Sequence, residues 1–325
     1  MSDHRQVSLG RKVAYGFGSV AFGVKSNGFD YFFLIFYSQV MGVSAYLVSL
    51  ALMIALIVDA LSDPLIGYLS DNTRSRWGRR HPFMYAAALP AAIAYYFVWN
   101  PPSGLEGDAL FPYIVTIAVV VRTLVTVYEI PSSSLVAEMS DDYDERTSML
   151  SYRYFFGWTG GTLMGAFATI FILVPTTTIS NGMFNVQGHG QVGAVAAMVI
   201  FVAMIVSTMG THKMIPDLKA PPPPRRMTVG LIYREVFETL ASRSFLALFL
   251  AALFGAVAAG VSTTLSFYFS TFFWGFTTEQ IGLISLSVVI SALLAFFIAP
   301  IISKKLGKKR GAITVGLMAF LSLIH

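Results

Sequence analysis

The sequence contains no cysteine, and charged residues make up only 12% of its 325 residues. The absence of cysteine excludes disulfides, thiolate metal sites and cysteine catalysis. Hydrophobic residues make up 55% of the chain, which excludes a soluble domain and is typical of a polytopic membrane protein. We therefore expect an all-α protein whose helices cross a lipid bilayer.

Long apolar runs divide the chain into nine expected helices. They cover residues 13–38, 44–70, 82–99, 109–136, 150–174, 192–210, 244–273, 279–303 and 311–325. The last run stops with the chain at His325, short of the roughly 20 residues that a span requires. We expect a complete six-helix N-terminal half at residues 1–210 and a truncated second half at residues 244–325. A cytoplasmic linker at residues 211–243 would join them, with a polyproline spacer at 221–224 and an amphipathic helix near 231–240.

Lysine and arginine are also missing from every second connection between these runs. Neither occurs around Gly42 or in residues 100–108, 176–191 and 273–280, whereas four arginines lie between residues 74 and 80. Because Lys and Arg concentrate in cytoplasmic loops, we expect the N-terminus in the cytoplasm. The formal charge of +5 then reflects membrane topology, and no nucleic-acid partner is expected. His189 lies in an outer connection with no second ligand nearby, so we expect it to be solvated.

Ionisable residues occur within the expected spans of the first half. Asp59 and Asp63 are four residues apart in the second span, so they share one helix face. An acid near the bilayer centre costs about 2.5–3.5 kcal/mol, which favours a functional site for a cation or a proton. The alternative is that these acids merely pair with basic neighbours. The other ionisable residues in the spans are Lys25, Asp30, Arg122, Glu129 and Arg153.

Helical rise places Glu129 at the depth of Asp63, with hydroxyl groups nearby. Carboxylate and hydroxyl oxygens suit a small hard cation, and the candidate Na⁺ ligands are the three carboxylates. The predicted cation site comprises Asp59, Ser62, Asp63, Thr126 and Glu129. We expect substrate contacts from Lys25, Asp30, Arg122 and Arg153. Two alternatives remain open: Arg122 and Glu129 share a helix face and would form a buried pair without a transport role, and Lys25 would pair with Asp59. Tyr31, Tyr128 and Trp158 are candidates for stacking on a sugar ring.

Several motifs resemble the glycoside–pentoside–hexuronide cation symporters, the melibiose-permease-like branch of the major facilitator superfamily. The most specific is Asp59-Ala60-Leu61-Ser62-Asp63-Pro64-Leu65-Ile66-Gly67, followed by Arg74-Ser75-Arg76-Trp77-Gly78-Arg79-Arg80. Weaker matches are Tyr15-Gly16-Phe17-Gly18, Ile130-Pro131, Glu145-Arg146-Thr147 before Tyr152-Arg153, and Ser242-Arg243-Ser244-Phe245. The chain departs from the family at Gly23, where melibiose-type members carry an acid, and at Ser133, where an aromatic residue is expected.

The resemblance implies a major facilitator fold that works by alternating access. It supports the cation site described above, a substrate contact from Arg153 and a cytoplasmic gate. The expected gating residues are Asp71, Arg74, Arg76, Gly78, Arg79, Arg80 and Arg146.

We therefore expect a monomeric symporter of a sugar or related polar solute in a bacterial inner membrane. Na⁺ or H⁺ would be the coupling ion, and no cofactor is expected. The alternatives are a transporter of a lysolipid-like solute with the same fold, or a non-transporting, truncated membrane protein. An intramembrane enzyme is not expected, because the spans contain no nucleophile–base pair and no metal-ligand spacing.

Overall fold

The computed structural model describes residues 7–177, 179–218 and 228–322, and the regular elements in these ranges are all helical. The N-terminal span comprises α1 (Leu9–Phe17), α2 (Ser19–Asn27), the π-helical turn η1 (Gly28–Phe32), α3 (Phe33–Ile35) and the π-helical turn η2 (Phe36–Val40). It is followed by α4 (Ala45–Asn72), α5 (His81–Trp99), η3 (Gly107–Leu110), α6 (Phe111–Met139), α7 (Tyr143–Phe167), η4 (Ala168–Ile172), η5 (Gly182–Phe184), α8 (Val186–His212) and η6 (Ile215–Asp217). The later elements are α9 (Val229–Leu240), α10 (Arg243–Tyr268), η7 (Phe269–Phe273), α11 (Thr278–Leu306) and α12 (Lys308–Ser322).

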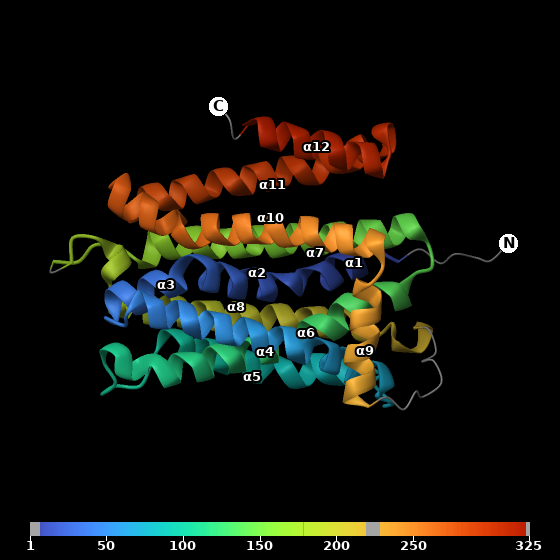
Figure 1. Cartoon of the computed structure of the whole chain (residues 1–325), viewed down its shortest axis with the longest axis horizontal. Coiled ribbons are helices and arrows are strands. Elements are labelled where there is room, and N and C mark those ends of the chain that lie inside the picture. Colours follow the sequence, from blue (N-terminus) through green and yellow to red (C-terminus); the bar gives the residue numbers. More distant parts are fainter. Residues whose placement is uncertain (1–6, 178, 219–227, 323–325) are drawn as a thin grey trace.

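Figure 1 shows the long helices lying side by side along one direction, with α9 running across them. Among the described residues, six helices are long and apolar enough to cross a membrane. The predicted all-α architecture is confirmed. The polyproline spacer expected at residues 221–224 lies outside the described residues.

Two helices begin earlier than the apolar runs indicated. The fifth expected span starts at Tyr143 rather than residue 150, because Asp142 caps α7 by accepting a hydrogen bond from the Glu145 backbone N–H at 2.7 Å. Acidic residues in the first turn also suit the positive end of the helix dipole. The sixth begins at Val186, where the Asn185 side chain accepts from the Gly188 backbone N–H at 3.0 Å. Polar caps therefore extend both helices beyond their apolar runs.

Close packing of glycines brings α2 against α7. A Cβ added at Gly23 would overlap the carbonyl of Gly157, and one added at Gly161 would lie 2.7 Å from the carbonyl carbon of Gly23. Side chains are therefore excluded where these helices cross. The same crossing explains why Gly23 carries no acid: the backbone of α7 occupies the space that a side chain there would need.

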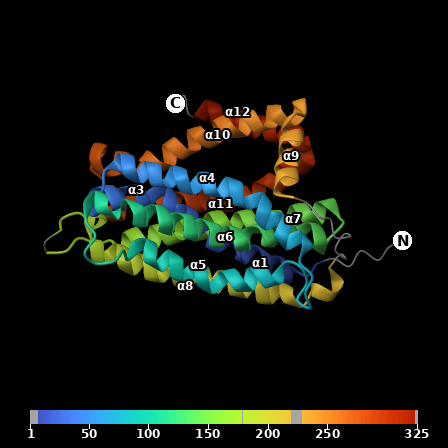
Figure 2. The same ribbon diagram turned by 60° about the horizontal axis from the view of Figure 1, so that its bottom comes forward.

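The remaining contacts place the later helices over the N-terminal ones. α4 packs against α6, α10 contacts η1, and α11 contacts α7. Figure 2 shows α10 and α12 on the side of the bundle opposite α5 and α8. A cavity therefore forms where α10 and α11 meet α2, η1 and α7.

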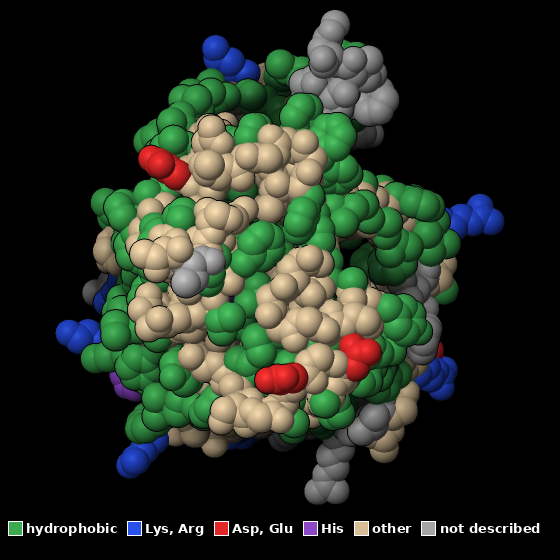
Figure 3. Space-filling view, turned by 90° about the vertical axis from the view of Figure 1, so that its left-hand side faces the viewer, with side chains coloured by type: hydrophobic (Ala, Val, Ile, Leu, Met, Phe, Trp, Pro, Cys, Tyr) green, Lys and Arg blue, Asp and Glu red, His purple; other side chains and the backbone are tan. Residues whose placement is uncertain are grey.

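The two ends of the bundle differ in charge. The connections α4–α5, α6–α7 and α11–α12 lie at the same end as the N-terminus, whereas α5–α6, α7–α8 and α10–α11 lie at the other (Figure 1). Figure 3 looks onto this second end, where Asp and Glu side chains reach the surface and Lys and Arg appear only around the rim. The sequence pattern of basic and non-basic connections thus becomes a separation in space.

Candidate functional site

Asp59 is held by two side chains of α6. Arg122 donates to Asp59 Oδ2 from Nη2 at 2.7 Å and from Nε at 3.1 Å. Thr126 donates to the other carboxylate oxygen, Oδ1, at 2.9 Å. Arg122 and Thr126 are four residues apart, so both reach the same face of α4. Both oxygens of Asp59 therefore already accept hydrogen bonds from protein groups.

Asp63 contrasts with Asp59, although both lie on α4. Its Oδ1 atom is buried and accepts no hydrogen bond. The side chain lies near Arg122 and Lys25, whose positive charges act on it, and near the negative charge of Asp59. Between the two acids, the Ser62 hydroxyl donates to the Asp59 carbonyl at 3.1 Å. Asp63 is thus the acid of this pair with an unused oxygen.

Glu129 pairs with Arg153 of α7 rather than with Arg122. The Arg153 Nη2 atom donates to Glu129 Oε1, and Nη1 donates to Ser132 Oγ at 2.8 Å. The guanidinium also lies over the Tyr15 ring, 5.2 Å from its centroid. Glu129 keeps one buried oxygen, Oε2, without a hydrogen-bond partner. The alternative Arg122–Glu129 pair is wrong, because each arginine finds an acid on a neighbouring helix instead.

Two of the three predicted Na⁺ ligands, Asp59 and Glu129, are held in separate ion pairs by Arg122 and Arg153. Among the described residues, no group of three or more His, Cys, Asp or Glu side chains is arranged to hold a metal ion. The Na⁺ site expected from Asp59, Asp63 and Glu129 stays a prediction.

Lys25 is buried on α2, and its ammonium lies 4.6 Å from the centroid of the Phe22 ring. The negative charges of Asp59, Asp30 and Glu129 act on it, as does the positive charge of Arg122. The alternative direct Lys25–Asp59 pair is not formed, because Arg122 occupies Asp59. Lys25 thus contributes a positive charge without touching the cavity described next.

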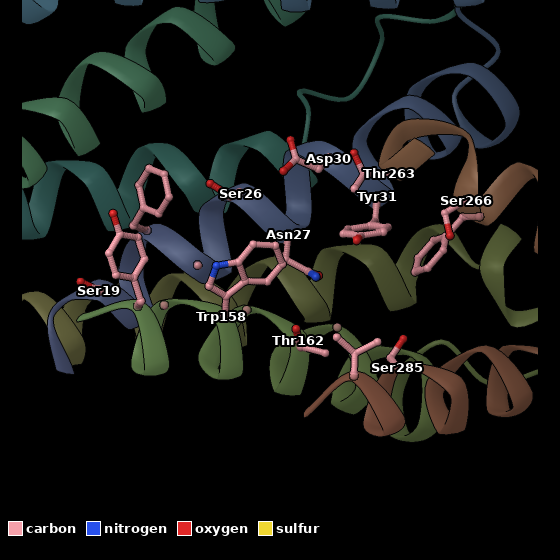
Figure 4. A pocket seen from close by; sticks show the side chains of 18 of the residues that line it. Ser19, Ser26, Asn27, Asp30, Tyr31, Trp158, Thr162, Thr263, Ser266 and Ser285 are labelled. Carbon is pink, nitrogen blue, oxygen red and sulfur yellow. The ribbon is translucent and has the colours of Figure 1, made fainter. Parts of the chain in front are cut away.

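A cavity of about 630 Å³ lies between α2, η1, α7, α10 and α11. That volume suits a small-molecule site. Of the predicted residues, Asp30, Glu129 and Arg153 line it, whereas Asp59, Asp63, Lys25 and Arg122 do not. Figure 4 shows Asp30 and Trp158 projecting into it from opposite walls, with Ser266 and Ser285 contributed by the later helices. The wall of the cavity thus combines charged, hydroxyl and aromatic side chains.

The aromatic candidates divide between the cavity and the core. Tyr31 and Trp158 line the cavity, and the Tyr31 ring lies 5.4 Å from that of Phe267 on α10. Tyr128 is fully buried and does not reach it. Only Tyr31 and Trp158 therefore remain candidates for stacking on a solute.

Sequence reasoning missed the polar lining of the cavity. The unassigned polar residues are Ser19, Ser26, Asn27, Ser133, Tyr154, Thr162, Thr263, Ser266, Ser270 and Ser285. A signal was present in the first span, since Ser19, Gly23, Ser26 and Asp30 recur at helical spacing and mark one polar face. Thr263, Ser266 and Ser270 recur at similar spacing in the seventh expected span, whereas Ser285 of α11 carries no such signal.

Glu138, which was not predicted as a site residue, binds two of the expected gating arginines. Glu138 of α6 is buried and accepts from Arg79 Nε and Arg80 Nε, each at 2.9 Å. Arg80 also pairs with Asp71 and donates to Ser70 Oγ at 2.7 Å. Glu138 and these partners, which we call the Glu138 network, join α6 to α4 and to the start of α5. Its signal in the sequence was an acid directly after an apolar run, at the end of the bundle that carries the arginines.

The remaining expected gating residues are Gly78, Arg146, Arg74 and Arg76. Gly78 has a φ of 74°, a left-handed conformation that favours glycine in the tight loop. Arg146 donates to the Ser140 carbonyl at 2.7 Å and lies 3.5 Å from Asp141. Arg74 and Arg76 are exposed in the α4–α5 loop, and Arg76 lies over the Trp77 ring at 5.9 Å.

His189 is buried rather than solvated, so that expectation is wrong. Its ring stacks on Trp99 with centroids 5.9 Å apart, and Nε2 lies 2.8 Å from the Met183 carbonyl. The early start of α8 at Val186 places His189 in a helix that packs on α5. It therefore acts as a packing residue between these helices.

Comparison with known proteins gives matches along most of the chain. Residues 14–325 match the family described as MFS/sugar transport protein. An uncharacterized symporter of Synechocystis sp. is 32% identical over 203 residues, which are 61% of this chain and 36% of that protein. The isoprimeverose transporter of Lactiplantibacillus pentosus is 26% identical over 222 residues, 66% of this chain and 45% of that protein.

A third relative has a different named solute. The sodium-dependent lysophosphatidylcholine symporter 1 of Mus musculus is 29% identical over 153 residues, which are 46% of this chain and 29% of that protein. The matched part of the chain covers less than half the length of each of these three relatives.

The helical architecture and the match across residues 14–325 agree with the resemblance read from the Asp59–Gly67 motif. This is an integral membrane protein, and it belongs to the MFS/sugar transport family of the major facilitator superfamily, with a putative glycoside/cation symporter of Escherichia coli among its relatives.

Proposed function

We propose that this protein is a secondary active transporter that carries a sugar or related polar solute by cation-coupled symport. The observation that carries the proposal is the cavity of about 630 Å³, which contains the Arg153–Glu129 pair beside Asp30. A guanidinium can bind hydroxyl or carboxylate oxygens of a solute. Trp158 and Tyr31 supply faces on which a ring can stack.

The coupling ion, Na⁺ or H⁺, acts through acids close to the cavity in this proposal. Glu129 lines the cavity with one unused oxygen, and Asp63 keeps another on the neighbouring α4. A cation bound at either oxygen changes the electrostatic potential at Arg153. Arg153 also binds the solute in this proposal, so ion binding and solute binding affect each other. Glu129 would thus link the ion and the solute. Thr126 and Ser62 would supply neutral oxygens to the same set, beside Asp59.

Alternating access would move residues 1–210 against residues 244–325, with residues 211–243 as the linker between them. The cavity is lined from both parts, so such a motion would change its exposure. The Glu138 network and Arg146 lie at the basic end, which we assign to the cytoplasm of a bacterial inner membrane. We propose a monomer as the working unit.

Uptake by the full-length protein in liposomes tests the proposal. A panel of labelled mono- and disaccharides is offered under separate Na⁺ and H⁺ gradients. We expect at least one sugar to accumulate, and we expect Arg153→Gln to reduce uptake about 100-fold, because losing a charged hydrogen bond costs about 1.5–3 kcal/mol.

The matched control is Arg234→Gln, which removes an arginine from an exposed ion pair of α9, 2.7 Å from Glu238. It should transport normally. Failure of the whole panel to accumulate under either gradient would reject sugar symport. Equal uptake by Arg153→Gln and the wild type would remove Arg153 from the site.

A lysolipid-like solute is the second candidate, favoured by one wall of the cavity. α10 and α11 present Phe267, Ile281, Ile284 and Val288 beside their serines. An acyl chain could lie on this apolar wall while its phosphate meets Arg153. Lysophosphatidylcholine and a labelled sugar are therefore offered together. Uptake of the lipid, with no sugar accumulation, would favour this second function.

A further inference from the structure

We propose that Arg122 is a tethered cation: its guanidinium fills the position at Asp59 that a coupling Na⁺ would otherwise take, so Asp59 does not bind Na⁺ in this protein. This inference rests on the proposed function, because it assigns the ion requirement of the same site. It concerns a residue that we first expected to contact substrate. Arg122 does not line the cavity, so the solute does not account for its position.

The geometry at Asp59 carries the first step. Three hydrogen bonds occupy most of the acceptor capacity of the carboxylate: Oδ2 accepts two N–H groups of Arg122, and Oδ1 accepts the Thr126 hydroxyl. The guanidinium also lies directly at Oδ2, where a Na⁺ would have to approach. The side chains of Asp59 and Arg122 are each only 15% exposed, so little water competes for these contacts. Charge-assisted hydrogen bonds of this kind are about twice as strong as neutral ones.

The charge around Asp59 carries the second step. Asp59 and Arg122 form a neutral pair before any ion binds. A Na⁺ at Asp59 would place a second positive charge beside the Arg122 guanidinium among poorly hydrated side chains, which is unfavourable.

The chemistry of arginine carries the third step. A guanidinium stays protonated under all ordinary conditions, unlike an ammonium, and its planar fork matches a carboxylate. It also stays attached to α6, so it cannot leave with the solute. The expected consequence is solute uptake that does not depend on Na⁺ at Asp59. Removing the guanidinium should open an acidic position and create a Na⁺ site at Asp59.

Thermal unfolding of the purified full-length protein tests this without requiring transport. The wild type, Arg122→Gln and Arg122→Lys are titrated with NaCl, and choline chloride controls for ionic strength. In the wild type and in Arg122→Lys, which keeps the cation, we expect no Na⁺-specific shift that Asp59→Asn removes; a Na⁺ response through Asp63 or Glu129 would persist in Asp59→Asn. In Arg122→Gln we expect a saturable rise in Tm of roughly 5 °C at about 100 times the Kd, because a ligand stabilises the state that binds it.

Two further variants identify the site. Asp59→Asn combined with Arg122→Gln should abolish the Na⁺-specific shift. Arg234→Gln, which also deletes one arginine from an ion pair but lies on α9, should not acquire a shift. Arg122→Met replaces Arg122→Gln if the latter does not fold, because it keeps an unbranched chain of similar length.

Two outcomes would overturn the inference. The first is a saturable Na⁺-specific shift in the wild type that Asp59→Asn removes, since Na⁺ would then bind beside Arg122; this measurement needs no Arg122 variant. The second is a folded neutral Arg122 variant with no Na⁺ response, which would make the pair purely structural. Failure of sugar uptake alone would reject the proposed function and leave the Tm result to decide the role of Arg122.

Discussion

Arg122 and Arg153 project from α6 and α7, and each holds an acid of a neighbouring helix. Arg122 binds Asp59 of α4, and Arg153 binds Glu129 of α6. Asp63 lacks such an arginine, and its Oδ1 atom accepts no hydrogen bond although it is buried. Because a buried acceptor is costly without a partner, Asp63 is the acid of α4 best placed to respond to an ion.

Replacing Asp63 should separate coupling from solute binding. Asp63→Asn keeps the shape of the side chain and leaves both arginine pairs intact, but removes the charge that attracts a cation. We expect accumulation against a gradient to be lost, while exchange of solute across the membrane at equal concentrations continues. Both are measured with labelled solute in liposomes. Arg153→Gln is the contrasting variant and should lose both activities.

Retention of full accumulation by Asp63→Asn would show that the ion acts elsewhere, with Glu129 as the next candidate. Loss of exchange as well would mean that Asp63 is needed either for solute binding or for folding. The Tm of the same sample distinguishes the two: a lowered Tm indicates a folding defect, and an unchanged Tm indicates a role in solute binding.

At the scale of elements, the contact between α2 and α7 depends on having no side chain at Gly23. A Cβ at Gly23 would overlap the Gly157 carbonyl, a backbone atom that cannot move alone. We expect Gly23→Ala to lower stability by about 1–3 kcal/mol through overpacking, and to lower Tm accordingly. Gly10→Ala is the matched control, because it lies in α1 and its added Cβ has nothing within 4 Å.

The expected difference between the two alanine variants has a clear sign. Gly10→Ala should be neutral or slightly stabilising, since alanine is the better helix former. An equal Tm for both variants would mean that α2 and α7 can separate without cost, and that the glycine crossing does not fix the cavity wall.

The spans were predictable because apolar length and charge pattern depend on the bilayer alone. The motif at Asp59–Gly67 also indicated the family. Helical rise, rather than the motif, predicted that Asp63 and Glu129 lie at one depth. The pairing of acids with arginines was not predictable. Helical spacing puts Arg122 and Glu129 on one face of α6, but it does not say which acid of α4 or which arginine of α7 lies opposite each of them.

The π-helical turns of the first span were equally hidden. η1 and η2 change the direction of side chains after Gly28 and Phe36 without any change in hydropathy. The early starts of α7 and α8 depended on polar caps, Asp142 and Asn185, that lie outside the apolar runs. Local hydrogen bonding, rather than hydrophobicity, therefore set the details that sequence reasoning missed.

At the scale of the whole molecule, the Glu138 network ties three helices together at the basic end. Glu138 is buried between Arg79 and Arg80, and Arg80 extends the contact to Asp71 and Ser70 of α4. All of these residues lie within residues 1–210, so the network stays inside one of the two parts that alternating access would move. It is therefore a candidate lock on the arrangement of α4, α5 and α6 within that part.

Neutralising Glu138 should release this lock. In Glu138→Gln, the largely buried Arg79 and Arg80 lose their shared acid, and among the described residues only Arg80 keeps a partner, the more exposed Asp71. Breaking a buried ion pair in this way lowers the stability by about 3 kcal/mol. The absence of cysteine from the chain allows a clean reporter, because Ser133→Cys adds a single thiol to the cavity wall. We expect thiol reagents applied from the basic end to label Ser133→Cys several-fold faster when Glu138→Gln is also present.

The matched control is Glu238→Gln, which breaks an exposed ion pair on α9 and should leave the labelling rate unchanged. An unchanged rate with Glu138→Gln in a folded protein would show that the network stabilises the fold without controlling access to the cavity.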